Sequence, residues 1–162
     1  MMGISADLRF EVQDLYDTYA EILDDGPLDQ FSKLFTDPCE YILTSRENYD
    51  EDLPLAVMRC ESRDMLEDRL RSVRELLMYE PRYTRHMISH VRIASVSDDG
   101  DKLEVNANYA VLETLHDEFT KILNAGRYVD TIIRGDDGIL RFQKKLCIYD
   151  SELIPNSIIL PV

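Results

Sequence analysis

The sequence predicts an α+β domain in which a strongly curved, cone-shaped antiparallel sheet wraps around one long helix. Three observations lead to this fold class. Apolar residues recur at helical spacing in about the first 80 residues, they alternate with polar residues from Tyr83 onward, and Asp-Asp-Gly turns divide the alternating part into long strands. No repeat, low-complexity segment or linker interrupts the pattern, so residues 1–162 are predicted to form a single domain.

Helices are expected within residues 1–36. Ser5 can cap the first helix, whose apolar positions from Leu8 to Leu23 follow helical spacing until the Asp-Asp-Gly-Pro segment ends it. Pro27 suits the first turn of a second, shorter helix.

Short strands are expected within residues 39–60, as CEYILTS (39–45) and PLAVMRC (54–60). The polar stretch RENYDED between them is predicted to be a loop.

A third helix is expected over residues 62–79, beginning at Ser62 and ended by Pro81. One face of it would carry the apolar residues Leu66, Leu70, Val73 and Leu77.

Residues 83–150 are predicted to form an antiparallel meander, because apolar and polar residues alternate as in strands with one solvated face. Gly100 and Gly138 each follow two aspartates, and glycine tolerates the positive φ that a hairpin turn needs. The expected strands are 83–97, 102–116, 119–134 and 139–150.

The composition limits the possible functions. Eighteen basic residues against 32 acidic ones give a formal net charge of -14, which disfavours nucleic-acid and anionic-membrane partners. No apolar run approaches the length of a membrane span and no secretory leader is evident, so a cytoplasmic protein is expected. The three widely spaced cysteines, Cys39, Cys60 and Cys147, are expected to be reduced and mostly buried.

The histidines do not predict a metal site. His86 and His90 are expected on one strand, where four residues rise about 13 Å, too far for two ligands of one ion. His116 is expected to be exposed at a hairpin end. The cysteine and histidine spacings of a Rieske cluster, a P-loop, a dinucleotide-binding glycine motif and a nucleophile elbow are all absent.

Acid–base chemistry is an open alternative, because a curved sheet around a helix leaves an open mouth into which polar side chains can point. The candidates are Tyr16, Asp17, Asp68, His86, Tyr109 and Asp130. The preferred interpretation is a structural polar network in which Asp68 and Arg69 pair with Arg85 or Asp130. Its predicted members are Asp68, Arg69, Arg85, His86 and Asp130.

Three long stretches carry a family resemblance: ESRDMLEDRLRSVREL, YTRHMISHVRI and NAGRYVDTIIRGDDGILRFQKKLCIYDSELIPNSIILPV. Together they resemble the small (beta) subunit of bacterial Rieske-type aromatic-ring-hydroxylating oxygenases, and the resemblance covers nearly the whole chain. ENYDEDLPLAVMRCES and LCIYDSELIPNSI are similar to small subunits of the salicylate 5-hydroxylase type, and less closely to those of terephthalate-type dioxygenases.

The resemblance implies a nuclear-transport-factor-two-like (cystatin-like) fold, shared with ketosteroid isomerase and scytalone dehydratase. It also implies a trimer of this chain in a three-plus-three assembly with a large (alpha) subunit, which carries the Rieske iron–sulfur cluster and a mononuclear iron. Electrons would come from NAD(P)H through a reductase and often a ferredoxin. Because the family's catalytic residues lie on the large chain, no catalytic, cofactor-binding or metal-binding residue is transferred to this one, and a structural and assembly role is expected.

The apolar segment 151–162 is predicted to be a C-terminal interface tail. Two prolines prevent it from forming an ordinary central strand. It is expected to pack against the base of the cone or a neighbouring subunit through Ile154, Pro155, Ile158, Ile159 and Leu160.

The sequence leaves two alternatives to a structural subunit. A stand-alone cone-fold isomerase, dehydratase or small-molecule binder would use Asp17, His86 or Asp130, and would need a cavity near the lower limit of ligand sites, roughly 300 Å³. Docking of a redox partner on the acidic surface is disfavoured, because ferredoxins are commonly acidic and like charges repel.

Overall fold

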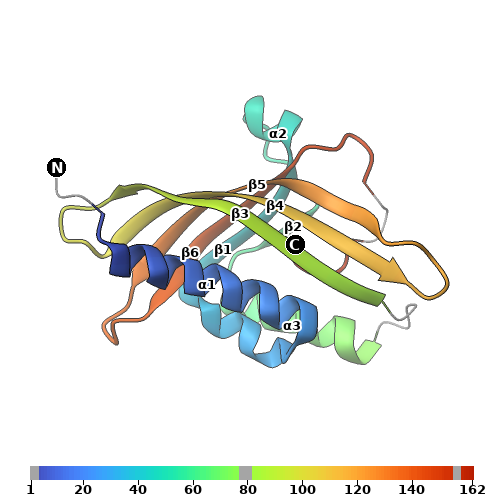
Figure 1. Ribbon diagram of the computed structural model, residues 1–162, viewed down its shortest axis with the longest axis horizontal. Coiled ribbons are helices and arrows are strands. Elements are labelled where there is room, and N and C mark those ends of the chain that lie inside the picture. The colour runs from blue at the N-terminus through green and yellow to red at the C-terminus, as the bar shows by residue number, and fades with distance from the viewer. Residues whose placement is uncertain (1–3, 77–81, 155–157) are drawn as a thin grey trace.

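The computed structural model describes residues 4–76, 82–154 and 158–162. One curved sheet has the strand order β2-β1-β6-β5-β4-β3, and α1, η1 and α3 cover one face of it while α2 rises from the other side (Figure 1). In chain order the elements are α1 (Ala6–Asp25), the 3₁₀ helix η1 (Leu28–Leu34), β1 (Phe35–Ser45), α2 (Arg46–Asp50), β2 (Met58–Cys60), α3 (Arg63–Leu76), β3 (Arg82–Val96), β4 (Lys102–Leu115), β5 (Lys121–Arg134) and β6 (Leu140–Tyr149).

Helix α1 is capped and amphipathic, as its sequence predicts. The Ser5 side chain accepts a hydrogen bond from the backbone N–H of Leu8, and Gly26 ends the helix with φ 80°. The buried face, which packs against the sheet, consists of Val12, Leu15, Tyr16, Tyr19, Ile22 and Leu23.

The sheet is mixed, which corrects the prediction of a wholly antiparallel one. Strands β3 to β6 form the expected antiparallel meander, and β2 pairs antiparallel with β1. Strand β1, however, runs parallel to β6, with Leu43 opposite Cys147. The reason is topological: a long connection through α3 and the meander brings the chain back beside β1 in the same direction.

The region before α3 departs most from the predicted boundaries. Strand β1 begins at Phe35, and Pro38 lies where its pairing with β6 is interrupted between Phe35 and Glu40, a position that tolerates the missing N–H. The predicted loop contains α2, because the Ser45 side chain accepts a hydrogen bond from the backbone N–H of Asn48. Strand β2 is limited to three residues.

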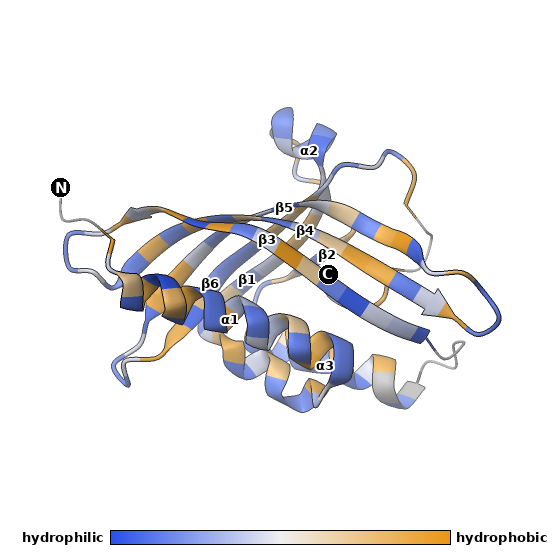
Figure 2. Cartoon of the chain, in the orientation of Figure 1, coloured by the Kyte–Doolittle hydropathy of each residue, from blue (hydrophilic) through white to orange (hydrophobic). Residues whose placement is uncertain are grey.

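The turns and the core agree with the sequence pattern. Gly100 and Gly138 have φ of 83° and 76° at the two predicted hairpin turns. Hydrophobic residues alternate along the strands (Figure 2), and their inward members form one buried cluster with α1.

All three cysteines are buried and free. The predicted core residue Leu77 lies outside the described residues. Within the described ranges, no helix is long and apolar enough to span a membrane.

Candidate functional site

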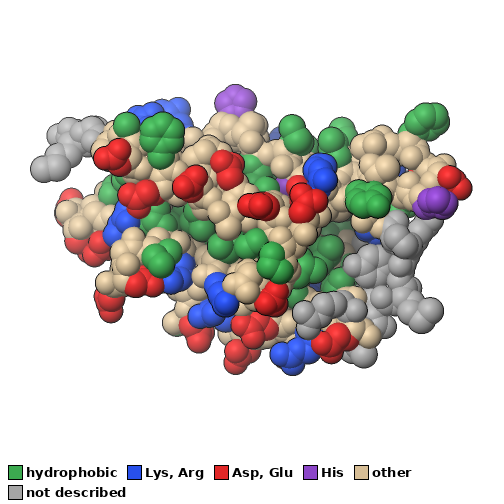
Figure 3. All heavy atoms as spheres, turned by 60° about the horizontal axis from the view of Figure 1, so that its bottom comes forward, with side chains coloured by type: hydrophobic (Ala, Val, Ile, Leu, Met, Phe, Trp, Pro, Cys, Tyr) green, Lys and Arg blue, Asp and Glu red, His purple; other side chains and the backbone are tan. Residues whose placement is uncertain are grey.

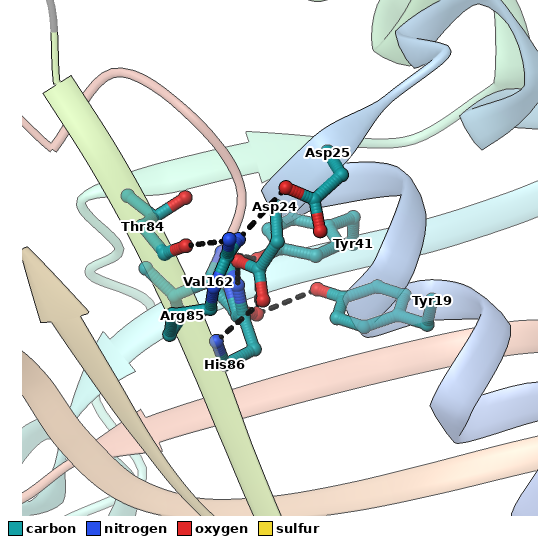
Figure 4. Close-up of polar contacts among 8 residues, drawn as sticks. All are labelled: Tyr19, Asp24, Asp25, Tyr41, Thr84, Arg85, His86 and Val162. Carbon is teal, nitrogen blue, oxygen red and sulfur yellow. Dashed lines mark hydrogen bonds and ion pairs between the residues drawn. The ribbon is translucent and has the colours of Figure 1, made fainter.

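Residues 158–162 close the mouth of the cone, the opening between the C-terminal end of α1 and the adjacent ends of β3, β4 and β5. The backbone N–H of Val162 donates to the Tyr41 hydroxyl at 2.9 Å, and the Tyr19 hydroxyl donates to the Val162 carbonyl oxygen at 2.5 Å. Figure 4 shows Val162 beside these two tyrosines, which come from α1 and β1. The segment is therefore held at its end by hydrogen bonds from two elements.

Helix α3 holds the same segment from another side. The Arg69 side chain donates to the carbonyl oxygen of Ile159 at 3.1 Å and to that of Ile158 at 3.4 Å. Ile158 is 7% exposed and Val162 only 1%. Ile154 and Leu160 are partly buried against the same core.

The tail was predicted to pack against the base of the cone or a neighbouring subunit, and within its own chain residues 158–162 pack at the mouth of the cone. The hydroxyl groups of Tyr19 and Tyr41 and the Arg69 guanidinium offer backbone partners there. Contact of Ile154, Ile158, Ile159 and Leu160 with another subunit stays a prediction, and Pro155 lies outside the described residues.

The space left under the segment is small. A cavity of about 20 Å³ lies between residues 158–162 and a wall that includes Leu23, His86 and Val111. That volume holds one water molecule, whereas ligand sites begin at roughly 300 Å³. The mouth therefore lacks the cavity that the isomerase, dehydratase or small-molecule-binding alternative requires.

Asp24 and His86 form a dyad beside this cavity. His86 Nδ1 lies 2.6 Å from Asp24 Oδ1, and the His86 backbone N–H donates to Asp24 Oδ2 at 2.8 Å (Figure 4). Burial tends to raise the pKa of Asp24, but the two hydrogen bonds and the charge of His86 outweigh it, so that the pKa is lowered. Such a pair is suited to proton transfer. Here, however, the side chains of the dyad are nearly fully buried and residues 158–162 cover the cavity beside them.

A second polar cluster lies deeper in the cone, where Lys145 and Asp130 are both fully buried. Lys145 Nζ lies 2.8 Å from Asp130 Oδ2, which also accepts a 2.5 Å hydrogen bond from the Tyr16 hydroxyl. The ammonium lies 3.5 Å from the ring centroid of Tyr128 and 4.5 Å from that of Tyr19. Burial raises the pKa of Asp130, although Lys145 and Tyr16 act against it. The charges of Lys145 and Asp130 therefore compensate each other inside the core.

The predicted polar network does not form as expected. Asp68 is exposed and lies 3.7 Å from Arg71, while Arg85 pairs with Asp25 at 2.9 Å. Arg69 binds the tail, as described above. The pairings were wrong because helical and strand periodicity predict the face of a residue but not its partner across the fold.

The other candidates are also dispersed. Asp17 is exposed and accepts a hydrogen bond from Gln13, and the buried Tyr109 hydroxyl donates to Asn124. His86 is buried whereas His90 and His116 are exposed, so the three histidines lie in separate environments. In the described part of the chain, no group of three or more His, Cys, Asp or Glu side chains is placed to hold a metal ion.

Sequence reasoning missed Asp24, Tyr41 and Lys145. A signal for Lys145 was present, because strand alternation places it on the same face as Cys147 and Tyr149, both of which are buried. An inward lysine requires a buried carboxylate, and Asp130 is the inward acid of the neighbouring strand. Asp24 lies in the predicted helix-terminating segment, and nothing in its local sequence indicates contact with β3.

Comparison with known proteins gives concordant results. Residues 18–156 match the family model described as "Ring hydroxylating beta subunit". The anthranilate 1,2-dioxygenase small subunit of Burkholderia cepacia is 32% identical over the full length of both chains. The structure superimposes with a TM-score of 0.85 on a beta subunit from Novosphingobium aromaticivorans, assigned to an aromatic-ring-hydroxylating dioxygenase. The two are 37% identical, and the match covers 94% of this chain and 95% of that one.

A more distant likeness concerns the fold alone. A protein of Novosphingobium aromaticivorans assigned as a scytalone dehydratase superimposes with a TM-score of 0.68 at 19% identity, covering 88% of this chain and 84% of that one. This confirms the predicted cone fold. It assigns no activity, because one fold hosts many unrelated functions.

Proposed function

Because this chain belongs to the ring-hydroxylating beta-subunit family, we propose that it is the structural and assembly subunit of a multicomponent aromatic-ring-hydroxylating oxygenase and has no catalytic site of its own. The observation that carries the proposal is the family match over residues 18–156, which reaches from the C-terminal part of α1 through β6.

The interior of the cone supports a role without chemistry. In the described part of the interior, two of the clusters with acid–base character are Asp24–His86, which residues 158–162 cover, and Asp130–Lys145, which lies in the core. Since a catalytic group must reach the proton that it transfers, neither cluster is placed to act on a substrate.

The partner in this proposal is a large (alpha) oxygenase subunit, in an assembly of three large and three small chains within the bacterial cytoplasm. The large chain would carry the Rieske cluster and the mononuclear iron, and a reductase would deliver electrons from NAD(P)H. This chain would support the arrangement of the large subunits, so that the cluster of one lies close to the iron of the next.

The substrate class in this proposal is an aromatic acid of the salicylate type. The relative from Burkholderia cepacia is named for anthranilate, which is also an aromatic acid with an ortho substituent. Substrate preference would depend on the large chain.

The tail contributes to assembly in this proposal. Leu153 is 89% exposed and Ile159 is only partly covered, so the segment presents apolar surface after its anchored residues have been buried. Ile154, Ile158, Ile159 and Leu160, with Pro155, would lie near the contact with a neighbouring subunit.

The test is to express the large subunit with and without this chain and to measure the mass and iron content of the product. We expect a mixed oligomer whose iron remains with the large chain after the subunits are separated. A large subunit that folds but never recruits this chain would contradict the proposal.

A further inference from the structure

A groove of about 650 Å³ lies between the N-terminal part of α1 and the second half of β3, outside the site described above. Arg9 and Phe10 line one side, and His90, Val91 and Arg92 line the other. Of the described residues that line it, none is acidic. In a chain of net charge -14, a surface with two arginines and a histidine but no carboxylate is unusual.

Arg9 and Arg92 differ from most other arginines of the chain in their ion pairing. Arg46, Arg85, Arg134 and Arg141, for example, contact carboxylates at 2.6 to 2.9 Å. Among the residues that the structure describes, the guanidinium groups of Arg9 and Arg92 have no ion-pair partner. Both guanidinium groups are exposed, so each is free to form a bidentate pair with a carboxylate from outside the chain.

A β-bulge shapes the groove. Between Ser89 and Arg92 strand β3 holds one more residue than the facing part of β4, and His90 has φ 54°, a left-handed conformation that a side chain rarely adopts. The bulge places His90, Val91 and Arg92 consecutively along the groove. Such strain persists only where the surrounding structure maintains it, and it occurs preferentially at functional sites.

The groove also carries interface chemistry. Phe10 is 73% exposed, and arginine with an aromatic residue is the combination enriched at the centres of protein contacts. Acidic side chains, by contrast, are spread over much of the face shown in Figure 3. An acidic segment with apolar neighbours would complement this groove.

The chain itself offers such a segment, residues 46–57, which projects from the other side of the sheet with α2 (Figure 1). It carries Glu47, Asp50, Glu51 and Asp52. It also exposes the apolar side chains of Tyr49, Leu53, Leu55 and Val57, by 40 to 60%. Glu47, Glu51 and Asp52 have no ion-pair partner among the described residues. The acidic and apolar surfaces of this segment therefore match the basic and apolar surfaces of the groove.

We propose that residues 46–57 of one copy of this chain dock into the Arg9–Arg92 groove of the next copy, so that carboxylates meet the unpaired arginines. The two surfaces are different, so the contact is head-to-tail, and a head-to-tail contact whose rotation closes forms a ring. This inference rests on the proposed function, because it supplies the contact between small subunits in the three-plus-three assembly. It also explains how copies that each carry a charge of -14 can associate.

The experiment measures the oligomer mass of the purified chain, alone and co-expressed with the large subunit. Arg9→Glu with Arg92→Glu should weaken self-association by about 100-fold, since each ion pair becomes a repulsion. Glu47→Arg with Glu51→Arg should do the same. A chain with all four substitutions should regain much of the wild-type association, because the substituted positions again pair opposite charges. Lys33→Glu with Lys121→Glu, which makes the same change in net charge as the two arginine substitutions but away from both surfaces, is the matched control for the groove variant and should leave the mass unchanged.

Circular dichroism verifies that each variant is folded, which is expected because Arg9, Arg92, Glu47 and Glu51 are exposed. Three results overturn the inference: a wild-type chain that is monomeric in both preparations, a folded groove variant of wild-type mass, or a four-substitution chain that stays dissociated. A wild-type chain that self-associates through the groove but never binds the large subunit would instead refute the proposed function and leave this contact standing.

Discussion

Asp130 and Lys145 are register partners on β5 and β6, and their side chains form an ion pair with zero solvent exposure. The pair lies among the aromatic side chains of Tyr16, Tyr128 and Phe142. Two opposite charges removed from water together are tolerated, whereas one alone is not.

The first prediction concerns this pair. Asp130→Leu or Lys145→Met alone should lower the free energy of unfolding by roughly 3 to 5 kcal/mol, because each leaves an uncompensated buried charge. The double variant should recover most of the loss. Urea denaturation of the four proteins provides the double-mutant cycle, and single and double variants of equal stability would contradict the prediction.

The second prediction concerns pH. Because the pKa of Asp24 is lowered in the folded state, its ionised form stabilises the protein above the unfolded pKa of about 3.9, and that stability is lost as the pH falls through the folded pKa. Asp24→Asn should therefore cost about 2 kcal/mol at pH 7, where charged hydrogen bonds to His86 are lost, and progressively less as the pH falls below the unfolded pKa. Denaturation at pH 7 and over a series of lower pH values measures the difference. Asp25→Asn, at an exposed ion pair with Arg85, is the control and should change stability by less than about 1 kcal/mol.

The third prediction concerns the tail. Deleting residues 158–162 removes the buried side chains of Ile158 and Val162 and the partners of Tyr19, Tyr41 and Arg69, so it should lower the melting temperature by several degrees. Ending the chain after Ser151 should also weaken assembly with the large subunit. Calorimetry and oligomer mass separate the two effects. Leu153→Ala, at an exposed position, should leave the melting temperature unchanged, and an unchanged melting temperature in the deletion variant would show that the segment is incidental.

The fourth prediction concerns the backbone of β5. A Cβ on Gly126 would lie 1.9 Å from the carbonyl oxygen of Ile148 on β6. Gly126→Ala should therefore separate the strands and destabilise the protein by roughly 3 kcal/mol or more. A Cβ on Gly135 would meet only the side chains of Asp137 and Arg141 closely, which can move, so Gly135→Ala should have a small effect. Thermal unfolding of both variants checks the contrast, and equal melting temperatures would refute it.

Much of the fold is predictable from the sequence because local chemistry determines it. Ser5 accepts a backbone hydrogen bond at the start of α1, Gly100 and Gly138 allow the hairpin turns, and alternation defines the inner face of β4. The parallel pairing of β1 with β6 was missed because it joins segments about one hundred residues apart, and no local pattern encodes the direction of such a contact.

The site was less predictable for the same reason. Tyr19, Arg69 and the end of the tail meet only after α1, α3 and the sheet have packed, so their hydrogen bonds depend on tertiary geometry. The family resemblance supplied the function, but it could not indicate that the apolar tail folds back into the mouth of its own cone.

The parallel contact between β1 and β6 also has a consequence for synthesis. When β1 leaves the ribosome, its only early strand partner is β2. Its other edge stays unpaired until β6, the last strand, has been translated. Unpaired edges aggregate, and contacts between distant segments form slowly. Expression yield should therefore be sensitive to growth temperature and to chaperone supply, because nearly the whole chain is made before its sheet can be completed.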